Sequence, residues 1–201
     1  MNLVASLIVF AALSATGWAQ ERSPAPANIA DELHHTVLLQ NSKVKVFRVK
    51  LQPDEATLPH RHVNFYAYLS LEPVTIANEV RGRPPVMVSL EASDVHTSKG
   101  GFAVAERNKS SQPAELIVIE AREPAAADFD TPMGGFRFHD AAFGELFQTS
   151  VMRAYTMTIA AGGRTEKHEE HCDRLVLAVT DLKLREDVAG QPTSELQMKA
   201  G

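Results

Sequence analysis

Two histidines one residue apart, His60 and His62, are the first candidates for metal chemistry. Alternate residues of a strand share a face, so such a pair can hold one ion between two imidazoles. Two neutral imidazoles alone make a poor site, since zinc and iron usually take three protein ligands. His96, on a later predicted strand, could supply the third nitrogen. The alternative, which the sequence favours, is that His60 and His62 face inward and form hydrogen bonds with neighbours or water.

A second group of candidate ligands follows a glycine pair in the later part of the chain: His168, Glu170 and His171. Nitrogen and carboxylate ligands in this combination suit manganese, iron or zinc. Cys172 follows directly, as a further ligand or as an oxidation-sensitive thiol. A solvated charged turn over residues 166–174 is the competing interpretation, and the sequence weights the two equally.

The composition is that of an ordinary globular protein, with 44% hydrophobic and 22% charged residues among 201. The formal net charge of −5 at pH 7 gives no electrostatic support to a nucleic-acid or anionic-membrane partner. Cys172 is the only cysteine, so the chain has no internal disulfide to stabilise it.

Short strands are the elements that must position the candidate ligands. Apolar and polar residues alternate over 43–51 and 86–90, as in half-buried strands. Residues 65–71 and 74–80 are rich in aromatic, aliphatic and β-branched side chains. The continuous apolar run at 116–119 is typical of a strand buried on both faces. Many short strands separated by Gly and Pro turns predict a sandwich or barrel without a long helix.

The chain contains an internal repeat at an offset of 108 residues, the difference between positions 146 and 38. Leu38–Leu51 falls on Leu146–Ile159 without a gap, and the same offset places His60 on His168. A register held over so many residues predicts a duplication. The expected divisions are a first barrel over 34–121, a connector over 122–142 and a partial second copy over 143–201.

The second copy ends early under this register, because Gly201 falls on Ser93 and leaves no equivalents of residues 94–121. A sheet without those strands exposes unpaired edges and half a core. Three explanations are a truncated gene, completion by strands of another subunit, and a half-barrel packed on the first barrel. The sequence favours the first of these.

The N-terminal segment, residues 1–19, has the pattern of a secretory signal peptide. Leu3–Leu13 is an apolar run too short to span a bilayer of about 30 Å. Small residues at Gly17 and Ala19 predict cleavage after Ala19, and a buried N-terminal helix is the competing interpretation. Residues 20–33 are then a flexible lead-in. The mature protein is expected to be soluble, free of the membrane, and periplasmic or secreted.

These residues resemble the cupin superfamily, over roughly 36–121 and again over 143–201. Pro59–His62 is similar to the first cupin motif, in which two histidines leave a strand and face the barrel interior. Residues 93–108, with Gly100–Gly101 at their centre, are similar to the turn–strand–turn frame of the second motif. The resemblance implies an all-β fold: a cupin-type double-stranded β-helix, or jelly-roll barrel, in one complete and one partial copy.

The resemblance also implies a metal site of three histidines and one glutamate, of which two residues are missing here. Tyr66 stands in the position of the glutamate and Val104 in that of the third histidine. In the second copy, the offset places Glu170 on His62, or His171 takes that place if the loop gains one residue. The first barrel is therefore expected to have a degenerate metal site.

We expect from these patterns an exported cupin-domain protein that binds a small molecule in the first barrel. Aromatic walls with few polar groups are typical of a ligand pocket, and they can equally fill a small barrel. The candidate lining residues are Phe65, Tyr66, Tyr68, Phe102 and Val104.

The sequence leaves open whether the protein is an enzyme. The alternative function is a metal-dependent cupin enzyme, such as a dioxygenase or isomerase, that uses iron, manganese, nickel or zinc. No catalytic residue can be assigned, because a fold does not dictate a reaction. A homodimer formed through sheet edges is a further expectation. Four arginines are interpreted as scattered surface residues and not as an anion site: Arg61, Arg81, Arg83 and Arg107.

Overall fold

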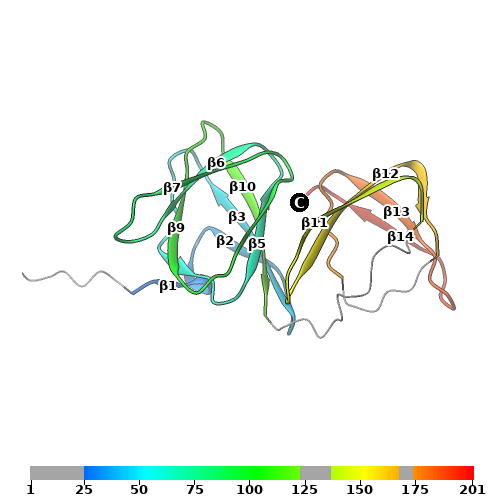
Figure 1. Cartoon of the computed structure of the whole chain (residues 1–201), viewed down its shortest axis with the longest axis horizontal. Helices are drawn as coiled ribbons and strands as arrows, with labels where there is room; N and C mark the ends of the chain where they lie inside the picture. Colours follow the sequence, from blue (N-terminus) through cyan, green and yellow to red (C-terminus); the bar gives the residue numbers. More distant parts are fainter. Residues whose placement is uncertain (1–24, 123–136, 168–173) are drawn as a thin grey trace, which may run out of the picture.

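The computed structural model describes residues 25–122, 137–167 and 174–201 (Figure 1). The predicted signal peptide and the second group of candidate ligands, with Cys172, lie outside the described residues. In the described part of the chain the only helix is a 3-10 turn, η1 (Ile29–Asp31). Those residues contain no helix of the length and apolarity needed to cross a bilayer.

The first half of the chain is all-β, as the sequence predicts. Its strands form two five-stranded sheets, in the orders β1-β4-β9-β6-β7 and β2-β3-β10-β5-β8. Neighbours far apart in sequence pair in both sheets, and every pairing except that of β1 with β4 is antiparallel. The bounds are β1 (Ala27–Asn28), β2 (His35–Gln40), β3 (Val44–Leu51), β4 (His60–Arg61), β5 (Tyr66–Ser70), β6 (Val74–Glu79), β7 (Val86–Leu90), β8 (Val95–Ser98), β9 (Ala103–Asn108) and β10 (Ala114–Ala121).

The core lies between the two sheets, where both contribute apolar side chains. Phe47 of β3 and Ile76 of β6 are 0% and 2% exposed, and both belong to one buried cluster. β10 is buried on both faces, as its apolar run predicts. Its Leu116 and Val118 join that interior cluster, whereas Ile117 packs into a second cluster on the outer face of the same sheet.

The barrel begins before residue 34. The second part of the expected flexible lead-in forms β1, which runs parallel to β4, and then η1. Glu32, directly after η1, is 2% exposed. The lead-in therefore contributes a buried carboxylate to the barrel, which its lack of periodicity did not indicate.

The later part of the chain forms two hairpins, β11 (Phe138–Gln148) with β12 (Arg153–Thr165) and β13 (Leu182–Glu186) with β14 (Ser194–Met198). Their registers repeat those of the β2–β3 and β6–β7 pairs at the same offset of 108 residues as the sequence repeat. The irregularity of β2 between Val37 and Leu39 recurs between Glu145 and Phe147. The matched pairs include His35↔Val49 with Phe143↔Met157, and Val74↔Leu90 with Leu182↔Met198.

The two hairpins lie beside the first barrel (Figure 1). Leu177 packs against the outer-face cluster of Val46, Leu69 and Ile117. The guanidinium of Arg48 donates a hydrogen bond to the carbonyl oxygen of Gly201. The later part of the chain therefore packs on one outer face of the barrel.

Candidate metal centre

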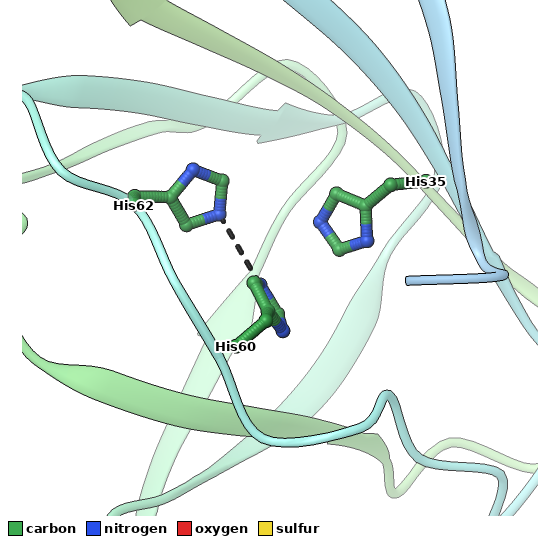
Figure 2. Close-up of side chains that lie close together, drawn as sticks. All are labelled: His35, His60 and His62. Carbon is green, nitrogen blue, oxygen red and sulfur yellow. Dashed lines mark hydrogen bonds between the residues drawn. The ribbon is translucent and has the colours of Figure 1, made fainter. Parts of the chain in front are cut away.

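Three imidazoles converge inside the first barrel, those of His35, His60 and His62 (Figure 2). One ring nitrogen of each lies within 4.8 Å of those of the other two. The Nε2 atoms of His60 and His62 are 3.3 Å apart, and the ring centroids of His35 and His60 are 4.6 Å apart. None of the three side chains is more than 2% exposed.

The three rings come from both sheets. His60 lies on β4 opposite Val104 of β9, and His62 follows two residues later, so both rings enter the interior from one sheet. His35 is the first residue of β2 in the other sheet. Closure of the barrel brings this third ring to the pair, although 25 positions separate His35 from His60 in the sequence.

Hydrogen bonds fix the orientation of two rings. Nδ1 of His35 lies 2.7 Å from Oε2 of the buried Glu32, and Nδ1 of His60 lies 2.9 Å from the carbonyl oxygen of Leu58. Both acceptors require the proton on Nδ1, which leaves a lone pair on each Nε2. A carboxylate or carbonyl behind the distal nitrogen is the usual support of a metal-binding histidine.

His62 is left with an unsatisfied nitrogen. Its Nδ1 is buried without a hydrogen-bond partner and lies 3.7 Å from Oε2 of Glu120. If Nε2 carries the only proton and donates to His60, the Nδ1 lone pair of His62 faces a carboxylate. If Nδ1 carries it, two Nε2 lone pairs face each other at 3.3 Å. A cation among the three Nε2 atoms removes the repulsion between the Nε2 lone pairs of His60 and His62. It therefore allows Nδ1 of His62 to carry the proton and face Glu120.

The charge states of the site favour a cation. Burial lowers the pKa of His35 to about 4, against the opposing hydrogen bond to Glu32, with smaller contributions from His60 and His62. Burial raises the pKa of Glu32, but hydrogen bonds from His34, His35 and two backbone N–H groups outweigh it and hold the pKa at about 2. At neutral pH, Glu32 is therefore ionised and the ring of His35 is neutral.

Three carboxylates surround the three rings. Glu32 lies behind His35, Glu120 lies 3.7 Å from His62, and Oε2 of Glu106 lies 3.5 Å from Nε2 of His60. Their side chains are 0%, 8% and 14% exposed. Within the described residues, no Lys or Arg forms an ion pair with any of them. Glu32 is already paired with the ring of His34 at 2.8 Å, so Glu106 and Glu120 are the two carboxylates beside the rings whose charge a cation would offset.

The ligand atoms fit a divalent transition metal. At about 2.0–2.1 Å from zinc, two tetrahedral nitrogen ligands lie about 3.4 Å apart, close to the separation of His60 and His62. Neutral imidazole suits zinc, copper, iron and nickel, whereas magnesium and calcium prefer oxygen ligands. The residues present therefore fit a transition metal held by three histidines.

A small pocket opens beside the ring of His35, with a volume of about 20 Å³, which is room for about one water molecule. His35 and Glu106, which belong to the site, also line this pocket. The other lining residues are aliphatic, aromatic or amide side chains: Val49, Tyr66, Tyr68, Ile76, Asn78, Leu116 and Val118.

Solved structures similar to the chain match part of it. A cupin domain from Bordetella pertussis Tohama I is 24% identical over 44% of this chain and 92% of its own, with a TM-score of 0.42. A cupin superfamily protein from Desulfitobacterium hafniense DCB-2 is 16% identical over 44% of this chain and 76% of its own, with a TM-score of 0.36. An RmlC-like cupin family protein from Methanocaldococcus jannaschii is 16% identical over 43% of this chain and 79% of its own, with a TM-score of 0.36. No protein-family model and no curated protein matches the chain.

The strand order decides the fold. From β3 to β10 the chain winds between two antiparallel sheets ordered β3-β10-β5-β8 and β4-β9-β6-β7. This is the eight-stranded jelly roll that cupins share. The first barrel has the cupin fold.

Two residues that replace the expected metal ligands of the cupin barrel have other roles. Tyr66 stacks on His62, with ring centroids 4.2 Å apart and planes at 28°. Val104 is 3% exposed and pairs with His60 across β4 and β9. The third imidazole comes instead from His35, for which the sequence analysis gave no role.

The residues proposed as pocket lining in the cupin barrel are not all together. Tyr66 and Tyr68 line the pocket. Phe65 lies with its ring centroid 6.2 Å from that of Phe147, and Phe102 is 45% exposed. Val104 is part of β9 and is not among the pocket residues.

His96 does not join the three histidines. It lies on β8, opposite Tyr68 of β5, with the two ring centroids 5.7 Å apart. The only grouping of three or more potential ligand side chains in the described residues contains His35 in its place. A signal for His35 does exist, because Glu32 precedes it by three residues and can support its ring. The spacing of Glu32 and His35 does not indicate a metal ligand unless the pairing of β2 with the other strands is known.

The double glycine of the cupin barrel fixes the backbone of His62. The N–H of Gly101 donates to the carbonyl oxygen of His62 at 2.7 Å. A Cβ on Gly100 would lie 2.2 Å from the carbonyl oxygen of Asn64, and its φ of +68° also favours glycine. The turn therefore holds the loop that carries His62 against β9.

Proposed function

We propose that the cupin barrel binds one divalent transition metal through Nε2 of His35, His60 and His62. The unpartnered Nδ1 of His62 carries the proposal, because a metal on Nε2 lets that nitrogen hold its proton toward Glu120. The carboxylates of Glu106 and Glu120, which lie 3.5 and 3.7 Å from ring nitrogens of His60 and His62, support the same conclusion. The metal is zinc, copper, iron or nickel, the ions that neutral imidazole suits.

The proposed metal has a coordination position free for a further ligand. Three protein ligands leave at least one coordination position open, and His35 places the site at the wall of the pocket. When bound, the metal supplies a Lewis acid that can polarise an oxygen of that ligand. Val49, Ile76 and Leu116 form an aliphatic wall of the pocket. We propose that the barrel is a metal-dependent small-molecule site.

The competing state of the site is metal-free, with a second proton on His62 in place of the metal. Zinc titration of chelator-treated protein by calorimetry separates the two states. We expect about one zinc per chain, and loss of binding in His60→Ala and in His62→Ala. Wild-type protein that takes up no zinc at neutral pH favours the protonated state and removes the proposal.

We also propose that the protein is exported. The apolar run Leu3–Leu13 and the small residues at Gly17 and Ala19 support cleavage after Ala19. Mass spectrometry of the protein purified from a secreting host is expected to find an N-terminus near Gln20. An intact Met1 contradicts export by this route.

A further inference from the structure

We propose that two copies of the chain form a dimer through one apolar face of the hairpin unit, β11–β14. The apolar face consists of Tyr155, Met157, Leu182, Leu184, Leu196 and Met198. At the repeat offset of 108 residues, each of these positions corresponds to a residue of the interior of the first barrel. The inference does not depend on the proposed metal site.

On β12, the apolar face is exposed where its counterpart in the first barrel is buried. Phe47 and Val49 of β3 are 0% and 1% exposed. Tyr155 and Met157, at the same positions of β12, are 37% and 40% exposed. The ring of Tyr155 does pack on Phe143 of the neighbouring β11, with ring centroids 4.7 Å apart. Side chains that form a core in the first barrel therefore remain partly open to solvent in the hairpin unit.

The hairpin of β13 and β14 has two unlike faces. Leu184 pairs with Leu196, and Leu182 pairs with Met198, so the four apolar side chains share one face. Leu196 is 42% exposed. The other face is charged, with Lys183 and Glu195 in an ion pair at 2.9 Å. An apolar face opposite a charged one is typical of a sheet that covers a core on one side.

Two strands of the hairpin unit also have open edges. In the described residues, β12 pairs with β11 alone and β13 with β14 alone. Their counterparts β3 and β6 each have a second neighbour, which is β10 for β3 and β9 for β6. The first barrel cannot supply these strands to the hairpin unit, because both β9 and β10 already have two neighbours. An open edge beside an exposed apolar face favours association with another chain.

A second copy of the chain is the occupant that fits this face. None of its six residues is charged, so the same face on two copies can meet across a two-fold axis without repulsion. Each copy supplies four strands, β11–β14, and the eight strands β3–β10 close the first barrel. The residues that contact the first barrel are others, among them Phe147, Leu177 and Gly201. Attachment of the hairpin unit to its own barrel therefore leaves the apolar face available.

Sedimentation velocity of the full chain over a range of concentrations tests the dimer. We expect a dimer in the wild type, and a dissociation constant at least about 30-fold higher in Met157→Lys, because the variant places a charge in the apolar contact. Thr158→Lys is the matched control: it adds the same charge at the next residue of β12, which is exposed and lies on the opposite face. Its dissociation constant should stay within about threefold of the wild type.

Hydrogen exchange followed by mass spectrometry locates the contact. In the wild type, peptides from β12 and β14 should exchange more slowly in concentrated than in dilute solution, because the dimer covers them. In Met157→Lys the exchange of these peptides should not depend on concentration.

Two results would overturn the proposal. One is a wild-type protein that stays monomeric at about 100 μM. The other is a dimer that Met157→Lys leaves intact, or that Thr158→Lys weakens as much, since the contact then lies elsewhere. If Met157→Lys does not fold, Leu196→Lys places the same charge on β14 of the apolar face and must weaken the dimer in the same way.

Discussion

Nδ1 of His62 lies 3.7 Å from Oε2 of Glu120 and has no hydrogen-bond partner, although both side chains are buried. Asn64 holds the other carboxylate oxygen of Glu120 through its backbone N–H and its side-chain amide, at 3.3 and 3.0 Å. Burial raises the pKa of Glu120, but the nearby His62 and the donors of Asn64 outweigh it and lower the pKa. An ionised carboxylate of Glu120 therefore lies beside Nδ1 of His62. When Nε2 of His62 binds a metal, the proton of the ring lies on Nδ1 and faces this carboxylate.

His35→Ala is expected to remove stoichiometric metal binding, because it deletes the one of the three clustered imidazoles that comes from the sheet of β2. His96→Ala is the matched control: it deletes a histidine of the same barrel that lies beside Tyr68 and outside the three rings. Metal content measured after equilibration with zinc distinguishes the two variants. Equal loss in both, or loss only in His96→Ala, contradicts the assignment of His35.

Glu32→Gln is expected to weaken metal affinity by about 10- to 100-fold, because the carboxylate orients His35 and raises its basicity as a ligand. Competition with a coloured chelator measures the change. Glu55→Gln is the control, since Glu55 is 40% exposed and contacts His34, which lies on the other side of Glu32. An affinity for Glu32→Gln within twofold of wild type rules out the supporting role.

Gly100→Ala is expected to lower metal affinity by at least about tenfold, because a side chain there displaces the backbone of His62 and Asn64. Gly82→Ala has a comparable φ of +74° and no atom within 4 Å of the added Cβ, so it tests backbone strain alone. The same chelator competition is used for both. The prediction fails if Gly82→Ala reduces affinity as much as Gly100→Ala does.

Asn108→Ala is expected to reduce the free energy of unfolding by about 2–4 kcal/mol, since it leaves buried backbone groups without partners. The side chain of Asn108 is fully buried, donates to the carbonyl oxygens of Leu51 and Gln112, and accepts the N–H of Ser110. Urea denaturation measures the change. Asn41→Ala, at an exposed turn, should cost less than half as much, and a larger cost there would count against this explanation.

Much of the fold could be predicted from the sequence because strand patterns are local. The alternation over 43–51 and 86–90 and the apolar run at 116–119 correspond to β3, β7 and β10. The repeat offset, found from residue identities, also matches the strand registers of β11–β14 to those of the first barrel. We interpret this agreement as a duplication of one unit, because the irregularity of β2 is repeated in β11.

The site was harder to predict because its members meet only when the two sheets close. The pair His60 and His62 could be recognised from its spacing of two residues. His35 and Glu106 come from β2 and β9, and nothing in the sequence relates them to that pair. Glu32 lies in a segment without periodicity, which indicated a flexible lead-in. The possibility that His96 supplies a third nitrogen followed from its place on a predicted strand. Its side chain lies beside Tyr68, and sequence alone does not show which strands meet at one end of the barrel.

Metal analysis of purified, tag-free protein by inductively coupled plasma mass spectrometry tests the central claim most directly. We expect about one zinc, copper, iron or nickel per chain in the wild type, and less than about a tenth of that in His35→Ala purified in parallel. A wild-type protein without stoichiometric metal, even after incubation with each of these ions, would contradict the proposed centre. The three histidines would then be a buried cluster held by hydrogen bonds, without a metal.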